Sequence, residues 1–219
     1  MIVAIDGPAG VGKSTVAKML ASKLGYLYLD TGALYRSVAW AVLQNGVSPA
    51  DAGAVSKLLP TLSLKMQFRN SAACVTVNGR DVTGALRTPE VSAAASVVSA
   101  IPAVRAWLLP VQRQIGERGS VVAEGRDVGT KVFPSAAVKF FLEADPTVRA
   151  QRRHRELVAA GHGGGIEQTG AEMAGRDDRD RSRAVAPLVP AEDAHHIDTS
   201  SLSAEDVVNQ MLAVVTAKL

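Results

Sequence analysis

The feature that most constrains this chain is a glycine-rich run, Gly7 to Gly12, which separates an apolar segment from an amphipathic one. Residues 2–5 are all apolar, a pattern typical of a strand that is buried on both faces. From Lys13 onward, apolar residues recur at four-residue spacing until Gly25, which predicts a helix that ends there. The chain therefore begins with a strand, a glycine loop and a helix.

The glycine-rich run matches the phosphate-binding P-loop pattern, G-x-x-x-x-G-K-[ST], at each defined position. The matching residues are Gly7, Pro8, Ala9, Gly10, Val11, Gly12, Lys13 and Ser14. Glycines let successive backbone N–H groups face an anion, and the start of the helix adds the positive end of its dipole. We expect Lys13 to bridge the β- and γ-phosphates of a nucleoside triphosphate and the Ser14 hydroxyl to bind Mg²⁺.

The rest of the chain alternates strand and helix patterns, except for one segment near the middle whose pattern is typical of an antiparallel hairpin. We expect strands over residues 26–29, 120–123, 138–142 and 195–197. We expect helices over residues 33–43, 88–99, 102–116, 149–159, 169–185 and from Ser203 onward. A polar turn at 30–32 precedes the first of these helices, and Ser203 and Asp206 form a capping pair at the start of the last. Alternating polarity from Leu62 to Phe68, followed by Asn78-Gly79 between apolar segments, predicts an inserted antiparallel hairpin. The fold class is therefore α/β, a P-loop-type parallel sheet flanked by helices with a small antiparallel insertion.

Composition indicates where in the cell this protein is expected to be. The 219 residues carry a formal net charge of +3, and the longest stretches without a charged residue are 14 long (37–50 and 91–104), shorter than the ~20 residues of a membrane helix. Cys74 is the only cysteine, and the first six residues, which already include an acid, show no secretory signal. We expect a protein of the reducing cytoplasm with no membrane partner.

The P-loop does not say which acceptor receives the phosphate. A GTPase would need a DxxG and an NKxD segment, which we do not find in suitable places, so a small-molecule kinase is the interpretation we favour. Three segments are candidates for its second substrate: 30–36, with a hydroxyl and an arginine; 124–127, with three ionisable residues after a buried strand; and 176–183. The alternatives are a simple helix cap for the first segment, a charged turn for the second and a salt-bridged surface helix for the third.

The third segment has a helical arrangement of charges. Arg176, Asp180 and Arg183 are spaced by four and three residues, which places them on one helix face. Asp177 and Arg181 fall on another face, where they can pair with each other. Eight arginines and no lysine between residues 149 and 183 favour the recognition of ligand phosphates.

These motifs together resemble the bacterial cytidylate kinases. The resemblance is carried in the same order over nearly the whole chain by GPAGVGKST at 7–15, DTGALYR at 30–36, EGRDVGT at 124–130, VFP at 132–134 and RDDRDRSRAVAPL at 176–188. It implies transfer of the γ-phosphoryl group of ATP to CMP or dCMP, with Mg²⁺. It also implies a core of residues 1–37 and 92–219, an inserted nucleotide-binding domain at 38–91 and a lid at about 152–171.

The resemblance also implies a role for each site residue. Residues 7–15, including Thr15, would bind ATP, and the residues in contact with the transferred phosphoryl group would be Lys13, Arg126, Arg152 and Arg183. The residues for CMP would be Thr31, Arg105 and Asp127 at the base, Ser96, Arg176 and Asp180 at the sugar, and Arg36, Arg126 and Arg183 at the phosphate. No histidine needs a role. The implied partners are small nucleotides without nucleic acid, and the implied state is a monomer.

Two other functions stay open on the sequence alone. A P-loop kinase for UMP, AMP or an alcohol is the nearest, and an alcohol would require a carboxylate base such as Glu124 or Asp127. An ATP-binding regulatory module that uses its arginine helix to bind RNA is the other, and its binding would depend steeply on salt.

Overall fold

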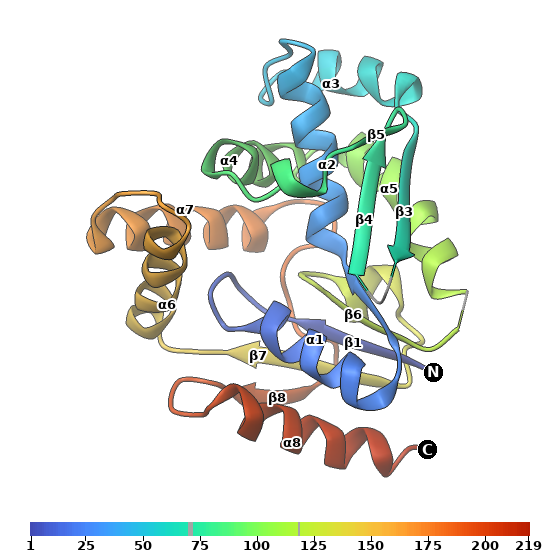
Figure 1. The fold of residues 1–219 in the computed structure, drawn as a ribbon, viewed down its shortest axis with the longest axis vertical. Helices are drawn as coiled ribbons and strands as arrows, with labels where there is room; N and C mark the ends of the chain where they lie inside the picture. Colours follow the sequence, from blue (N-terminus) through green and yellow to red (C-terminus); the bar gives the residue numbers. More distant parts are fainter. Residues whose placement is uncertain (70–71, 118) are drawn as a thin grey trace. The chain divides into compact units, whose positions relative to one another are not determined.

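The structure is a computed structural model that describes residues 1–69, 72–117 and 119–219. The chain divides into two compact units. Unit 1 comprises Met1–Tyr26 and Gly119–Leu219, and unit 2 comprises Leu27–Arg118. In Figure 1, unit 1 has the blue start of the chain and its yellow to red end.

The parallel sheet expected from the sequence is present. It has five strands, and the four in unit 1 lie in the order β6-β1-β7-β8. They are β1 (Ile2–Asp6), β6 (Val121–Gly125), β7 (Val138–Glu143) and β8 (His195–Asp198). Asp6 is aligned with Gly125 across the β1–β6 pair, so the chain leaves both strands at the same edge of the sheet. That edge is where ligands bind on sheets of this kind.

The described residues of unit 1 include four α-helices: α1 (Lys13–Leu24), α6 (Pro146–Ala159), α7 (Ile166–Ser182) and α8 (Ala204–Thr216). Helix α1 packs against α8, and α6 packs against α7 (Figure 1). The predicted capping pair is confirmed, because Ser203 and Asp206 form a capping box at the start of α8. Helix α7 begins and ends three residues earlier than expected, since Glu167 already complements its first turn and Arg183 is extended.

Unit 2 begins with β2 (Leu27–Asp30), the fifth strand of the main sheet, and its remaining elements are α2 (Thr31–Gln44), α3 (Ala52–Leu58), β3 (Leu64–Arg69), β4 (Ala72–Val77), β5 (Arg80–Asp81), α4 (Pro89–Val98) and α5 (Pro102–Gly116). The inserted antiparallel sheet is confirmed in the order β3-β4-β5. Asn78 and Gly79 both have positive φ, 50° and 79°, as a two-residue hairpin turn requires. The side chain of Phe68 lies outside the described part.

Two expectations for unit 2 were wrong. Residues 31 and 32, expected in a turn, form the first turn of α2, because the Asp30 carboxylate accepts a hydrogen bond from the N–H of Ala33 and caps the helix. The short helix α3 was not expected at all. Among the described residues no single helix has the length and apolar content to span a membrane; α4 and α5 pass that test only together, and they are bent by 102° at their junction.

Candidate active site

The P-loop connects the end of β1 to the start of α1 in a conformation that needs its glycines. Gly10 and Gly12 have φ of 77° and 93°, in the left-handed region. A Cβ on Gly7 would collide with the carbonyl oxygen of Leu142, and a Cβ on Gly10 would lie 2.9 Å from the carbonyl oxygen of Arg149. The loop is therefore pressed against its neighbours, which leaves no room for a side chain at Gly7 or Gly10.

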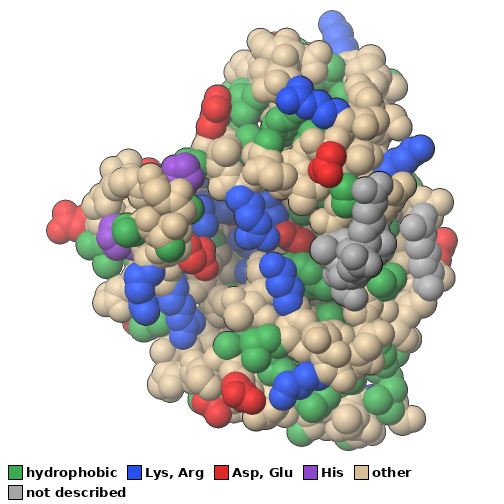
Figure 2. Space-filling model, viewed as in Figure 1, with side chains coloured by type: hydrophobic (Ala, Val, Ile, Leu, Met, Phe, Trp, Pro, Cys, Tyr) green, Lys and Arg blue, Asp and Glu red, His purple; other side chains and the backbone are tan. Residues whose placement is uncertain are grey.

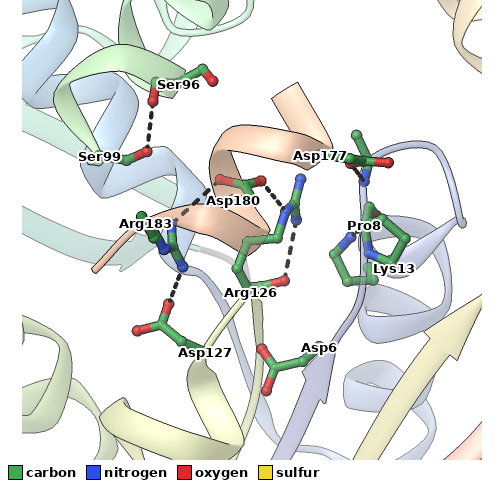
Figure 3. Close-up of polar contacts among 12 residues, drawn as sticks. Asp6, Pro8, Lys13, Ser96, Ser99, Arg126, Asp127, Asp177, Asp180 and Arg183 are labelled. Carbon is green, nitrogen blue, oxygen red and sulfur yellow. Dashed lines mark hydrogen bonds and ion pairs between the residues drawn. The ribbon is translucent and has the colours of Figure 1, made fainter. Parts of the chain in front are cut away.

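Lys13 lies at the start of α1 and is 6% exposed. Its Nζ donates a hydrogen bond of 2.6 Å to the carbonyl oxygen of Pro8 (Figure 3). Burial and the positive charge of Arg126 lower its pKa to about 7, with a smaller contribution from Arg176, against the carboxylates Glu124 and Asp6. A buried lysine with a lowered pKa beside other cations is a site that a bound phosphate would stabilise. Ser14, the next residue, is half-buried, and Thr15 is exposed.

The structure brings together four of the residues predicted at the acceptor site. Arg126 follows β6, and its Nε donates to Asp180 Oδ2 at 3.0 Å. Arg183, at the end of α7, reaches Asp180 Oδ1 and Asp127 Oδ1, both at 3.4 Å (Figure 3). Burial raises the pKa of Asp180, but the charges of Arg126, Arg176 and Arg183 outweigh it and hold the pKa below its usual value. The result is a charged Asp180 between two guanidinium groups.

Asp6, the last residue of β1, was not predicted as a site residue from the sequence. Its carboxylate is 4% exposed and accepts hydrogen bonds from the N–H groups of Val128 at 2.8 Å and Gly129 at 2.7 Å. Burial raises its pKa to about 6, although these two hydrogen bonds oppose the shift. Asp6 thereby holds the π-helical turn Val128–Val132 that follows Asp127. The sequence does show an acidic residue directly after the predicted buried strand, and this signal could have marked Asp6 as a candidate site residue.

Asp177 is not paired with Arg181, although their spacing allows that pair. Helix α7 buries Thr169, Met173, Asp177 and Asp180, which makes Asp177 part of its inner face, whereas Arg181 is exposed. Asp177 forms a buried ion pair with Arg149 of α6. The sequence does contain a signal for this burial. Thr169, Met173, Asp177 and Asp180 are spaced by four, four and three residues, which places them on one face of a helix.

Arg152, predicted to reach ATP, lies half-buried on α6. Its guanidinium donates to Thr199 Oγ1 at 3.0 Å and to the Thr199 carbonyl oxygen at 2.6 Å. The Thr199 hydroxyl in turn donates to the carbonyl oxygen of Val11 in the P-loop at 3.0 Å. Basic side chains are visible along α6 in Figure 2, and this helix carries four arginines.

Of the remaining predicted residues, Arg176 lies half-buried on α7 in unit 1, and the others belong to unit 2. Thr31 is buried in the first turn of α2, and the side chain of Arg36 on the same helix is 17% exposed, with Nη2 donating to Asp30 Oδ2 at 2.6 Å. Burial raises the pKa of Asp30, but the charges of Arg36 and Arg87 hold it below its usual value. Asp30 does cap α2, as the simpler interpretation of 30–36 had it, but Arg36 is not a surface residue.

Ser96 and Arg105 lie on consecutive helices of unit 2. Ser96, on α4, is 4% exposed, and its carbonyl oxygen accepts a hydrogen bond from Ser99 Oγ at 3.0 Å (Figure 3). Arg105, on α5, is 6% exposed. Its guanidinium lies 5.3 Å from the ring centre of Tyr35 and donates to the carbonyl oxygen of Ser99 at 3.1 Å. Both are therefore buried polar residues, and the guanidinium of Arg105 is held by its neighbours.

Comparison with known proteins gives a family match and several relatives. The family described as cytidylate kinase matches residues 3–217. The chain is 46% identical over 218 residues to a cytidylate kinase of Carboxydothermus hydrogenoformans, covering 100% of this chain and 98% of that protein. It is 49% identical over 216 residues to a bifunctional pantoate ligase/cytidylate kinase of Synechococcus elongatus, covering 96% of this chain but only 41% of that longer protein.

The chain thus spans about two fifths of the length of the bifunctional relatives. Among solved structures, an uncharacterized protein from Eubacterium ventriosum superposes with a TM-score of 0.56 at 12% identity, covering 99% of this chain and 98% of that chain. That likeness concerns the fold alone.

Proposed function

The chain belongs to the cytidylate kinase family, and from this membership we propose that it transfers the γ-phosphoryl group of ATP to CMP or dCMP, giving ADP and CDP or dCDP. The observation that carries the proposal is the pairing, at one edge of the unit 1 sheet, of a P-loop that contains buried Lys13 with a cluster of Arg126, Asp127, Asp180 and Arg183. A phosphate cradle alone would fit any P-loop protein. The arginine cluster beside it fits a second phosphorylated substrate.

The donor substrate of the proposed reaction is ATP with Mg²⁺. The N–H groups of residues 10–15 and the Lys13 ammonium suit its phosphates, and the Ser14 hydroxyl suits the metal ion. Among the described residues no cluster of three or more His, Cys, Asp or Glu side chains could hold a metal ion. We therefore infer that Mg²⁺ arrives bound to ATP, with the phosphates as its main ligands.

The acceptor residues divide by chemistry. The phosphate of CMP would be held by Arg36, Arg126 and Arg183, whose planar guanidinium groups bind phosphate oxygens in pairs. Ser96, Arg176 and Asp180 would contact the sugar. Thr31, Arg105 and Asp127 would contact the base, where a carboxylate accepts from the N4 amino group of cytosine and an arginine donates to its acceptors.

The proposed reaction needs electrostatics more than acid–base chemistry. ATP and CMP bring about six negative charges and Mg²⁺ removes two, which leaves roughly four for the protein to balance. Lys13, Arg36, Arg126, Arg152 and Arg183 can supply that charge. The attacking atom is a phosphate oxygen that is already an anion at neutral pH, so no general base is needed. Closure of a lid at 152–171 would exclude water from the transfer.

Several expectations stay predictions. They are the division into core, insertion and lid, the monomeric state, the cytoplasmic location and the lack of nucleic-acid and membrane partners.

The test is ADP production by the purified chain with ATP and Mg²⁺ against CMP, dCMP, UMP and AMP in parallel. We expect CMP and dCMP to give the highest kcat/KM. A higher value for UMP or AMP would contradict the proposed acceptor. Steeply salt-dependent RNA binding without acceptor-dependent ADP release would contradict the kinase function altogether.

A further inference from the structure

One buried ion pair holds both main-chain polar groups of Ala9 in the P-loop. The N–H of Ala9 donates to Asp177 Oδ1 at 3.3 Å, and its carbonyl oxygen accepts from Arg149 Nη1 at 3.1 Å. The same Arg149 Nη1 pairs with Asp177 Oδ2. Figure 3 shows Asp177 lying against the loop beside Pro8. The two peptide groups that flank Ala9 are thus each held by a hydrogen bond, one to Asp177 and one from Arg149.

The Arg149–Asp177 ion pair and its hydrogen bonds to Ala9, which we call the clamp, are buried and have further contacts that restrict their motion. Arg149 and Asp177 are 7% and 2% exposed, and Arg149 Nε also donates to the carbonyl oxygen of Ala144 at 3.2 Å, just before α6. A buried ion pair is costly unless further hydrogen bonds complete it, and these contacts do so. The loop also packs directly on both helices, since a Cβ on Gly10 would lie 2.7 Å from Met173 Cε of α7.

We propose that Arg149 and Asp177 are positioning residues for the donor site of the proposed kinase. They fix the Ala9 peptide so that the N–H groups of the following residues are already aimed inward before ATP binds. A glycine-rich loop without this support would have to be ordered by the nucleotide itself, which weakens binding.

The two residues must act as a pair. Asp177 places a negative charge at the P-loop, and Arg149 neutralises it. Without Arg149 the carboxylate would repel phosphate, and without the charge of Asp177 the Arg149 guanidinium would be a buried charge without its partner. The effects of the two substitutions should therefore be less than additive in the double variant.

The experiment is calorimetric titration of ATP and, separately, CMP into the full chain and its variants Asp177→Asn and Arg149→Lys. We expect the Kd for ATP to rise about 10-fold to 100-fold in both variants, while the Kd for CMP changes by less than about twofold. Asp178→Asn is the matched control, because it removes the same charge from the exposed neighbouring residue of α7, and it should leave both values unchanged.

Equal losses for ATP and CMP, or a lower melting temperature with unchanged ATP affinity, would assign the pair a purely structural role and overturn the inference. If Asp177→Asn does not fold, Arg149→Lys decides, because it keeps the positive charge and removes the guanidinium that contacts Asp177, the Ala9 carbonyl and the Ala144 carbonyl at once. Because the inference rests on the proposed function, the unaltered chain is measured first. Lack of ATP binding there would refute the proposed function, whereas normal binding in all variants would refute the clamp alone.

Discussion

At the scale of single residues, the state of Lys13 controls how the P-loop responds to pH. Its pKa is lowered to about 7, so at pH 8 most of the side chain is neutral before ATP binds. The phosphates of ATP favour the charged form and should raise this pKa, so binding at pH 8 should take up about one proton. Titration in two buffers of different ionisation enthalpy measures the uptake. An enthalpy that does not depend on the buffer would contradict the lowered pKa.

Asp6 is an acid whose pKa is raised, and it makes the free energy of unfolding depend on pH. Its pKa is raised from 3.8 to about 6 in the folded chain, so the folded state binds the proton more tightly than the unfolded state between these values. Its contribution to the free energy of unfolding therefore falls as the pH rises from about 4 to 6, by roughly 3 kcal/mol.

Chemical denaturation at pH 4.5 and pH 7.5 tests this effect of Asp6. We expect the wild-type chain to lose more stability between the two values than Asp6→Asn, in which the titrating group is gone. Equal losses in the two proteins would mean that the carboxylate titrates at its ordinary pKa.

Asp127 is the residue to which we assign the choice of base. Uracil presents an acceptor where cytosine presents its amino donor, so the carboxylate of Asp127 should oppose UMP. Asp127→Ala is therefore expected to lower kcat/KM for CMP more than for UMP in steady-state assays. Because Asp127 also pairs with Arg183, some common loss is expected, but equal losses for both substrates would count against the assignment.

At the scale of elements, the hairpin of β4 and β5 depends on one glycine. Gly79 has a φ of 79°, and a Cβ there would meet nothing within 4 Å, so Gly79→Ala would be strained without a collision. We expect it to lower the free energy of unfolding by about 1 kcal/mol. Gly84→Ala is the matched control, because that site is also open and lacks positive φ. Thermal unfolding of both variants tests the prediction, and equal melting temperatures would contradict it.

The sequence predicted the elements whose signals are local. The P-loop strand and helix, the Asn78-Gly79 turn and the Ser203 capping box each need only a few neighbouring residues, and all are confirmed. Helix α3 was missed because only Val55 of its seven residues is buried, which leaves no amphipathic pattern. The start of α2 was missed because the capping bond of Asp30 looks like a turn in the sequence.

At the scale of the whole molecule, charged residues could be singled out where the sequence gives a local signal, which is helical spacing for Asp180 and Arg183 and a place after a buried strand for Arg126, and their roles stay predictions. It could not be predicted where one residue meets another far along the chain. Asp6 meets Val128 across 122 residues, and Ala9 meets Asp177 across 168 residues. Only the folded sheet and the packing of α6 on α7 bring these groups together.

ATP should stabilise the chain without the acceptor, since all P-loop groups and the residues that hold them belong to unit 1. At an ATP concentration of 100 times Kd, the free energy of unfolding should rise by about 2.7 kcal/mol. Differential scanning calorimetry with and without MgATP measures this as a higher melting temperature. Lys13→Met should lose the increase, and Lys23→Met, which changes an exposed lysine of the same helix, should keep it. An increase that survives in Lys13→Met would place ATP elsewhere.

The contact between Lys13 and the carbonyl of Pro8 has a further consequence. The ammonium already has a good neutral acceptor at rest, so an arriving ion must outcompete a short hydrogen bond before it can settle. A polyphosphate presents several charged oxygens at once and so competes for Nζ more strongly than a single monovalent anion does. We therefore expect the resting contact with Pro8 to favour polyphosphate ligands over simple salt ions.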